Sequence, residues 1–345
     1  MKKKIALITG VNGQDGSYLA EFLLKKNYIV HGIRRYSSTS NLKNLDNILK
    51  NKKFKNYFFL HYGDITDTDS LYQIVQKTKP QEIYNLAAQS HVHVSFMVPE
   101  YTAQVDALSQ LRILEVVKEI NPKIKIYQAA SSELYGQSNL KILNEKTNFN
   151  PVSPYSVAKQ YGFFISKVYR TAYNIFVCNG ILFNHESPRR GLSFVTRKIT
   201  SSVVDIVKGK AKILIIGNLN AKRDWGYAPE YVEAMWKMLQ QKKPDDYVIA
   251  TGKQYSVKNF VEETFKYFNI IIIWRGIGIN QKGYDKKTGN LLVKVDPYYF
   301  RPNEVYNLRG DYAKAKKKLK WSPKTSFKQL VKLMIEAELK NDTCI

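Results

Sequence analysis

Short apolar runs alternate with a longer amphipathic pattern along the first half of the chain. Residues 17–26 have the spacing of an amphipathic helix. The apolar runs are IALIT at residues 5–9, YIVHGI at 28–33, YFFLHY at 57–62, EIYNLAA at 82–88 and IKIYQAA at 124–130. Runs of this length are typical of buried strands, and strand–helix–strand alternation indicates a parallel sheet with helices on both faces. We therefore predict an α/β fold with a doubly wound parallel sheet.

The second half of the chain has a less regular pattern. It predicts a strand within residues 211–216, a helix near 231–241, an apolar strand near 270–273 and a terminal helix after Ser326. We expect two domains. Residues 1–180 form the nucleotide-binding domain, to which some later segments return, and residues 181–345 form a smaller mixed α/β domain that mainly binds substrate.

The charge of the chain is strongly basic, with a formal net charge of +25. Its lysines are scattered through KNKKFKN, KGKAK and KAKKKLK, whereas nucleic-acid readers usually concentrate charge on one element. We therefore expect no nucleic-acid partner, and a positive field that attracts small anions.

Other features of the composition bear on location. No stretch has the length and apolarity of a membrane span, and MKKKIALITG breaks too early, at Thr9-Gly10, for a secretory signal. Two cysteines, Cys178 and Cys344, build no disulfide framework and fit a reducing cytoplasm. We expect a cytoplasmic protein without a metal site.

A glycine-rich loop follows the first predicted strand and opens a helix. Gly10, Gly13 and Gly16 are spaced so that a pyrophosphate can approach the backbone at the helix N-terminus, beside Gln14 and Asp15. In this context the pattern favours dinucleotide binding over a plain tight turn, and hence a Rossmann-type sheet.

An arginine pair ends the second predicted strand. An NAD-binding fold usually has an acidic residue there for the ribose diol, whereas Arg34 and Arg35 suit a phosphate. We therefore predict NADP as the cofactor; an exposed arginine pair is the alternative. Asp64, near the end of the third strand, either contacts adenine or caps the next helix.

Two further motifs suggest proton transfer. Tyr155 and Lys159 of YSVAK are four residues apart on a predicted helix, so phenol and ammonium share a face. Only about one tyrosine in a thousand is ionised at neutral pH, and a neighbouring ammonium together with a cationic nicotinamide would lower that cost. Glu133, in SSELYG at the end of a strand, must be solvated, paired or catalytically used.

The glycine loop, SSELYG and YSVAK together resemble the extended short-chain dehydrogenase/reductase superfamily. Longer phrases across almost the whole chain are similar to those of GDP-mannose 4,6-dehydratases: GQDGSYLAEFLL, HGIRR, PEYTAQVDAL, CNGILFNHESPRRG, FVTRKIT, RDWGYAPEYVEAMW, VIATGKQYSV and DPYYFRPNEV. The resemblance implies a redox-neutral lyase that uses bound NADP to oxidise C4 of a GDP-hexose, eliminate water across C5 and C6, and return the hydride to C6. It also implies a homo-oligomer, a dimer or tetramer.

The resemblance assigns roles to single residues. It makes Tyr155 the base at the C4 hydroxyl, Lys159 its electrostatic partner and Ser131 a hydrogen-bond donor to O4, while Glu133 moves the C5 proton to the departing hydroxyl. The implied cofactor contacts are Gly10, Gly13, Gln14, Asp15, Gly16, Arg34, Arg35, Ser37, Asp64, Ile65, Leu86, Ala88, Ser90, Tyr101, Lys159, His185 and Arg190. The implied substrate contacts are Ser90, Ser131, Glu133, Tyr155, Asn184, Val195, Lys198, Arg223, Arg301 and Glu304.

Several alternatives stay open within this interpretation. His185 is either a cofactor contact or a satisfied loop residue, and Arg223 and Arg301 either bind a diphosphate or form structural ion pairs. The family usually has threonine at position 131, so the serine hydroxyl is less fixed. Tyr36 interrupts a serine run that the family places near a tetramer contact.

Other functions fit parts of the same pattern. A GDP-manno-heptose would undergo the same chemistry as GDP-mannose and differs only beyond C6. A superfamily epimerase needs no acid at position 133, whereas a sugar-acid decarboxylase can carry a similar SSE phrase. A non-catalytic nucleotide or RNA binder is the alternative from another class.

Overall fold

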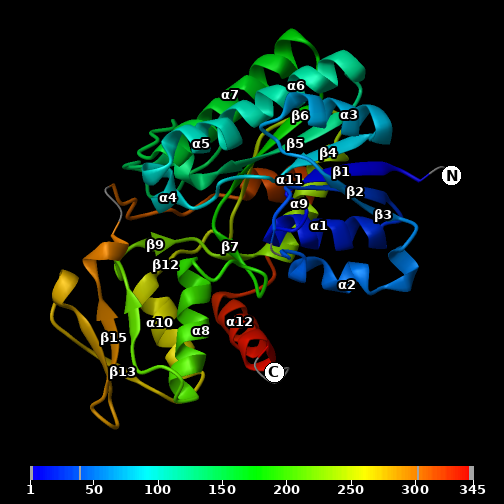
Figure 1. The fold of residues 1–345 in the computed structure, drawn as a ribbon. Helices are drawn as coiled ribbons and strands as arrows, with labels where there is room; N and C mark the ends of the chain where they lie inside the picture. Colours follow the sequence, from blue (N-terminus) through cyan, green and yellow to red (C-terminus); the bar gives the residue numbers. More distant parts are fainter. Residues whose placement is uncertain (1–2, 39, 301–302, 342–345) are drawn as a thin grey trace. The chain divides into compact units, whose positions relative to one another are not determined.

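The computed structural model describes residues 3–38, 40–300 and 303–341, which form two compact units (Figure 1). Both units are discontinuous in sequence. The first comprises Met1–Leu182, Ala228–Ile249 and Asp311–Ser322; the second comprises Phe183–Tyr227, Ala250–Gly310 and Pro323–Ile345.

The first unit is built on a seven-stranded parallel sheet with the order β11-β6-β5-β4-β1-β2-β3. The predicted doubly wound sheet is thus confirmed. The strand order reverses between β1 and β4, and in such sheets ligands bind at that reversal, beyond the carboxyl ends of the strands. The strands are β1 Ile5–Thr9, β2 Ile29–Arg34, β3 Phe58–Tyr62, β4 Glu82–Asn85, β5 Lys125–Ser131, β6 Val177–Leu182 and β11 Tyr247–Ile249.

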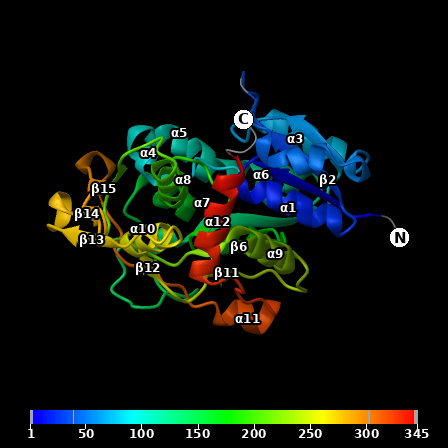
Figure 2. The same cartoon turned by 90° about the horizontal axis from the view of Figure 1, so that it is seen from below.

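Helices cover both faces of this sheet. On one face α1 and α9 pack side by side, as both views show (Figures 1 and 2). The other face is covered by α3, α6 and α7. The helices of the unit are α1 Gln14–Lys25, α2 Asp46–Leu49, α3 Thr68–Thr78, α4 Val92–Met97, α5 Pro99–Ala103, α6 Ser109–Ile120, α7 Pro154–Ala172, α9 Ala228–Leu239 and α11 Ala313–Leu319. Short segments are η1 Lys43–Leu45, η2 Lys52–Phe54, the π-helical η3 Gln104–Leu108 and η4 Ser132–Tyr135.

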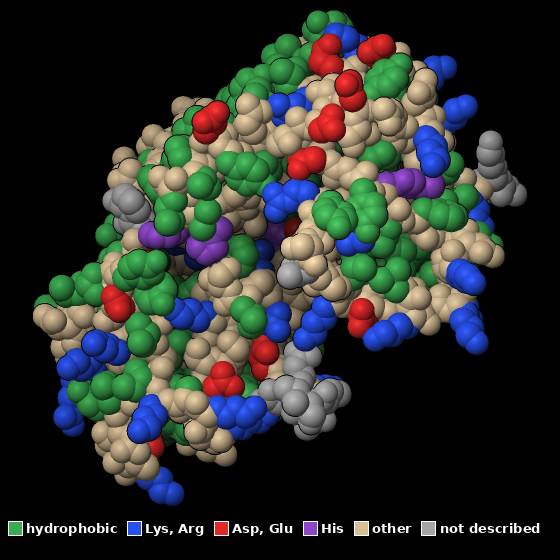
Figure 3. Space-filling view, viewed as in Figure 1, with side chains coloured by type: hydrophobic (Ala, Val, Ile, Leu, Met, Phe, Trp, Pro, Cys, Tyr) green, Lys and Arg blue, Asp and Glu red, His purple; other side chains and the backbone are tan. Residues whose placement is uncertain are grey.

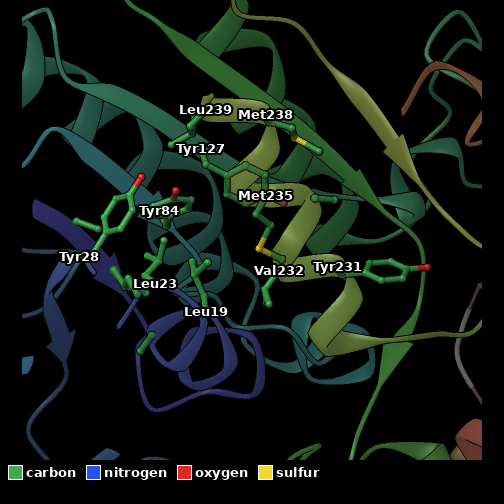
Figure 4. Packing of buried hydrophobic residues seen from close by; sticks show 14 of the residues in the cluster. Leu19, Leu23, Tyr28, Tyr84, Tyr127, Tyr231, Val232, Met235, Met238 and Leu239 are labelled. Atoms are coloured by element: carbon green, nitrogen blue, oxygen red, sulfur yellow. The ribbon is translucent and has the colours of Figure 1, made fainter. Parts of the chain in front are cut away.

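Alternation along the strands produces two cores. Ala6 and Ile8 of β1 belong to the core under α1 and α9, whereas Leu7 belongs to the core on the opposite face. In Figure 4, side chains of α9 lie against Leu19 and Leu23 of α1 and against Tyr84 and Tyr127 of the sheet. The α1–α9 packing joins segments more than two hundred residues apart, so this core needs the later part of the chain.

The last segment of the first unit is fixed by one tryptophan. Trp321 is 2 % exposed, and its indole N–H donates to the main-chain oxygen of Glu230 at the start of α9, at 2.8 Å. Its ring packs edge-on against Tyr231, at 5.7 Å between centroids. Residues 311–322 are thereby held to α9.

The second unit is a smaller mixed α/β assembly. Its four-stranded sheet has the order β13-β14-β15-β8, antiparallel except for the β15–β8 pair, and α8, α10 and α12 share its apolar core. Its helices are α8 Val195–Val207, α10 Val257–Lys266 and α12 Phe327–Asn341, with short turns η5 Gly278–Asn280 and η6 Pro297–Tyr299. Its strands are β7 His185–Glu186, β8 Leu214–Ile216, β9 Lys222–Arg223, β10 Gly226–Tyr227, β12 Tyr255–Ser256, β13 Ile272–Arg275, β14 Lys282–Asp285 and β15 Leu291–Val295.

The surface charge is dispersed. Lysine and arginine side chains are spread over both units on the face shown in Figure 3, without a continuous basic stripe. Among the described residues, no helix combines the length and apolarity required to cross a membrane.

Candidate active site

Loops from several strands meet at the carboxyl edge of the parallel sheet. The Thr9 hydroxyl, at the end of β1, donates to Asn85 Oδ1 at the end of β4, at 2.8 Å. The Thr9 hydroxyl oxygen also accepts hydrogen bonds from the main-chain N–H groups of Leu86 and Ala87, each at 3.0 Å. Thr9 therefore fixes the loop after β4, which contains the predicted contacts Leu86 and Ala88, against the glycine loop after β1.

The glycine loop turns tightly into α1. Gly10 has φ +65°, and a Cβ there would lie 2.8 Å from the Ala87 Cα, while a Cβ at Gly16 would lie 2.3 Å from the Gly10 oxygen. Gly13, the N-cap of the twelve-residue α1, offers no side chain to the N–H groups of the first turn. Such a helix start binds an anion through backbone N–H groups, and Gln14 and Asp15 stand in that turn.

The arginine pair lies at the end of β2, on the same sheet edge. Arg34 donates to the Tyr62 hydroxyl at 2.5 Å and lies over its ring, and Arg35 donates to the Tyr101 hydroxyl at 2.6 Å. Tyr101 is itself a predicted cofactor contact, so the structure brings it together with Arg35. Arg35 and Ser37 are exposed, as an approaching phosphate requires.

Asp64 follows β3 and does not cap the next helix. It accepts hydrogen bonds from the main chain and hydroxyl of Thr66 at 2.9 and 2.8 Å, whereas Asp67 accepts from the Ser70 N–H as the N-cap of α3. The capping alternative for Asp64 is therefore wrong, because the helix begins three residues later than that alternative requires. Ile65 is buried, and Ser90 is exposed after β4.

Glu133 stands on a rigid turn directly after β5. Ser131, the last residue of β5, caps η4 by accepting from the Glu133 N–H at 3.2 Å. The next residues, Leu134 and Tyr135, are fully buried, and Tyr135 donates to the Asn144 oxygen at 2.8 Å. Gly136 ends the turn with φ +50° and ψ −128°. Glu133 is 7 % exposed and fixed from both sides.

Tyr155 and Lys159 lie on the buried face of α7. The helix starts with a reciprocal capping box between Ser153 and Ser156. The ammonium of Lys159 is 5.8 Å from the centroid of the Tyr155 ring and donates to the Ala129 oxygen of β5 at 3.3 Å. Tyr155 is 8 % exposed and Lys159 is 4 % exposed, so the pair is not a surface contact.

The expected lowering of the Tyr155 pKa depends on a bound cationic nicotinamide as well as on Lys159, and burial opposes it. Burial raises the pKa of Tyr155, and the opposing effects of the Lys159 charge and a hydrogen bond with Ser131 do not outweigh it. Asp106 and Glu133 raise the pKa further. Contacts link these residues in pairs: the Glu133 N–H donates to the Ser131 hydroxyl, and the Lys159 ammonium lies near the Tyr155 ring.

Asp106, from the π-helical segment η3, was missed by the sequence reasoning. Its Oδ1 lies 3.3 Å from the Lys159 ammonium, and the residue is 1 % exposed. Burial raises its pKa to about 6, although Lys159 opposes the rise. The available signal was a single acid within the apolar pattern of YTAQVDAL.

The other predicted cofactor residues belong to the second unit. His185 is on β7 and buried, and its Nδ1 lies 2.8 Å from the Phe183 oxygen, so Nδ1 carries the proton that it donates to this main-chain oxygen. Arg190 stacks over Phe194 at 3.7 Å and pairs with Glu186 at 3.2 Å.

Among the predicted substrate residues of the second unit, Arg223 and Glu304 contact each other. Arg223, 5 % exposed, pairs with Glu304 at 3.0 Å and donates to the Val305 oxygen at 2.6 Å. The Lys198 ammonium lies 3.4 Å over the Tyr299 ring. Val195 begins α8, and the main-chain oxygen of Asn184 accepts from the Gly226 N–H. Arg301 lies outside the described residues.

Comparison with known proteins identifies the family to which the chain belongs. The family described as GDP-mannose 4,6 dehydratase matches residues 7–334. The chain belongs to this family. A GDP-mannose 4,6 dehydratase of Drosophila melanogaster is 53% identical over 342 residues, covering 98% of this chain and 87% of that protein. One from Vibrio cholerae is 51% identical over 353 residues, covering 99% of this chain and 95% of that protein.

Solved structures show the same fold at lower identity. The dehydratase chain matches a UDP-glucose 4-epimerase of Thermotoga maritima with a TM-score of 0.82 and 22% identity, over 98% of this chain and 99% of that one. It matches a dTDP-glucose 4,6-dehydratase of Bacillus anthracis, solved with NAD, with a TM-score of 0.80 and 20% identity, over 99% and 98% of the two chains.

Proposed function

We propose that this protein converts GDP-D-mannose to GDP-4-keto-6-deoxy-D-mannose by a redox-neutral 4,6-dehydration. Family membership over nearly the whole chain supports the substrate class. The observation that carries the reaction type is Glu133, a buried carboxylate whose charge acts on the Tyr155 pKa. Oxidation at one carbon needs a single base, whereas elimination of water needs a second group that both takes and gives a proton.

The cofactor is a nicotinamide dinucleotide, and the residues of the first unit fit one. Gly10 and Gly16 permit the tight turn into α1, where added side chains would collide with the main chain, and a pyrophosphate fits at the N-terminus of that helix. When bound, the nicotinamide supplies the acceptor, and later the donor, of one hydride. Arg34 and Arg35 favour NADP over NAD because guanidinium groups bind a 2′-phosphate. A tighter dissociation constant for NAD than for NADP would contradict this choice.

The side chains divide the remaining work. Tyr155 takes the proton of the C4 hydroxyl, and the Ser131 hydroxyl hydrogen-bonds O4. Lys159 stabilises the phenolate, which its position on the same face of α7 allows. Glu133 removes the proton at C5, which an adjacent C4 ketone makes acidic, and transfers it to the C6 hydroxyl as that group leaves as water.

Two variants separate these steps. Tyr155→Phe should block oxidation, so that neither reduced cofactor nor product forms. Glu133→Gln should still oxidise C4 and accumulate reduced cofactor with the 4-keto sugar. Absorbance at the reduced-nicotinamide band in a single turnover, with mass spectrometry of the sugar, measures both. Normal turnover by Glu133→Gln would refute the role of the carboxylate.

The sugar itself is tested by a panel that contains GDP-mannose and a GDP-manno-heptose. We expect a higher kcat/KM for GDP-mannose. A much higher kcat/KM for the heptose would keep the chemistry and replace the sugar, because specificity is a ratio of these values.

A further inference from the structure

Asp106 is a buried carboxylate to which the proposed reaction assigns no role. It stands in η3, between α5 and α6, where the π-helical turn inserts an extra residue into an otherwise continuous helical stretch. Such insertions are frequent at functional sites. Its side chain is fully buried, so a charge on it needs a partner within the protein.

The partner is Lys159 of α7. The ammonium lies 3.3 Å from Oδ1 of Asp106 and 3.3 Å from the main-chain oxygen of Ala129, so it is held between η3 and β5. Gly162, one turn further along α7, packs against the same segment. A Cβ on Gly162 would lie 3.4 Å from the Asp106 main-chain oxygen and 3.2 Å from the Gln128 amide nitrogen.

The two charges depend on each other. Burial penalises an isolated ammonium and favours its neutral form, whereas a carboxylate in contact with it favours the charged form. A neutral Lys159 could not stabilise a phenolate at Tyr155. We propose that Asp106 is a positioning residue, whose carboxylate keeps Lys159 charged and holds it beside Tyr155. The consequence for catalysis rests on the proposed function, whereas the charge pairing does not.

The pKa shifts agree with this arrangement. Burial pulls the pKa of Lys159 down, but Asp106 and Tyr155 raise it above its usual value. The nearby Glu133 acts on Tyr155. Besides Lys159, only burial and a hydrogen bond from the main chain of Gln89 shift the Asp106 pKa. No ionisable side chain of α4, α5 or α6 is among the causes.

Asp106→Asn tests the inference, because it removes the charge and keeps the shape. Without the carboxylate, burial of Lys159 is unopposed, and its pKa should fall by roughly 1–3 units. Lysine labelled with ¹³C at Cε reports this titration by NMR in the purified chain without substrate. The Lys159 signal is the one missing from Lys159→Arg.

The pH profile of turnover provides a second readout. Removing a negative charge lowers the pKa of both Tyr155 and Lys159, so both limbs of the kcat profile should move to lower pH. A purely structural loss would lower kcat without moving either limb. Asp106→Glu, which keeps the charge on a longer arm, should bring the Lys159 pKa back towards the wild-type value.

Asp246→Asn is the matched control. Asp246 is 7 % exposed and pairs with Arg170 of α7, the helix that carries Lys159, at 2.5 Å. This variant therefore also removes a buried charge that anchors α7. We expect lower stability with an unchanged Lys159 pKa and unchanged limbs. If Asp246→Asn moves the limbs as Asp106→Asn does, the effect is structural and the inference fails.

The wild-type chain keeps the inference testable if Asp106→Asn does not fold. The chemical shift of the Lys159 signal, plotted against pH, should then show a second inflection near the pH at which a ¹³Cγ-labelled Asp106 titrates. If the two side chains titrate independently, the pairing is refuted. The experiment also separates a failure of this inference from a failure of the proposed function. A chain that dehydrates no GDP-sugar but shows the Lys159 shift refutes the function alone, and a working dehydratase without the shift refutes the inference alone.

Discussion

Gly136 ends the turn that carries Glu133, and its replacement by alanine gives a quantitative test of the site's rigidity. The residue has φ +50° and ψ −128°, a conformation open mainly to glycine. A Cβ built there lies 1.7 Å from the Asn150 main-chain oxygen, about 1.3 Å short of the 3.0 Å that real Cβ atoms keep. The turn must therefore open when alanine is introduced.

The cost has two parts that a control can separate. An alanine held at positive φ costs at least about 1–2 kcal/mol by itself, and forcing a methyl group into a packed site costs about 1–3 kcal/mol more. Gly209 has φ +72°, and a methyl group added there would have no atom within 4 Å, so Gly209→Ala carries only the first part. We expect a loss of about 2–5 kcal/mol for Gly136→Ala and about 1–2 kcal/mol for Gly209→Ala.

The effect on catalysis should be larger still for Gly136→Ala. Glu133 is three residues away on the same turn, and a misplacement of about 1 Å can cost on the order of 100-fold in rate. Urea unfolding followed by tryptophan fluorescence measures stability and reports on both units, since Trp236 and Trp321 belong to the first unit and Trp225 and Trp274 to the second. Steady-state kcat at saturating substrate measures the rate.

Two results would overturn this reasoning. Equal losses of stability in the two variants would mean that the Asn150 contact relaxes without cost. A kcat close to wild type in a folded Gly136→Ala enzyme would mean that the turn does not set the position of Glu133.

Three further predictions concern other parts of the chain. Ser153→Ala removes the cap of α7 and should lower the stability of the first unit by about 1 kcal/mol in urea unfolding. Burial and then His61 lower the pKa of His31 to about 4, so the unfolded chain binds more protons than the folded chain between pH 6.5 and 4. The free energy of unfolding should therefore fall as pH drops through that window. The fall should be smaller in His31→Asn. If Arg223 binds the diphosphate, Arg223→Lys should raise KM roughly tenfold with little change in kcat, whereas Lys222→Met, at its exposed neighbour, should leave KM unchanged.

The sheet was the most predictable part of the structure. Five of its strands coincide with the predicted apolar runs, β2 and β5 each ending one residue beyond the run, because each run is bounded by turns. The edge strand β11 has three residues, too few to show a period, and the sequence does not say which strand it pairs with. Its pairing with β6 is a long-range contact that only the folded chain reveals.

The candidate site was predictable where chemistry and local geometry coincide. Tyr155 and Lys159 share a helix face by spacing alone, and the structure places both on the buried face of α7. Asp106 could not be placed, because an acid in an amphipathic helix usually faces solvent and its burial comes from the π-helical turn. The raised pKa of Tyr155 likewise depends on burial, which the motif does not encode.

The discontinuity of the first unit sets an order for its biosynthesis. While the ribosome has delivered only the segment up to Leu182, the nascent chain has β6 at its edge with every side chain of that strand buried in the finished protein, and nothing yet to cover it. Such an edge is prone to aggregation until β11 emerges, and Trp321 is synthesised later still. An expression plasmid that stops after the sixth strand should therefore yield inclusion bodies instead of an isolated nucleotide-binding fragment.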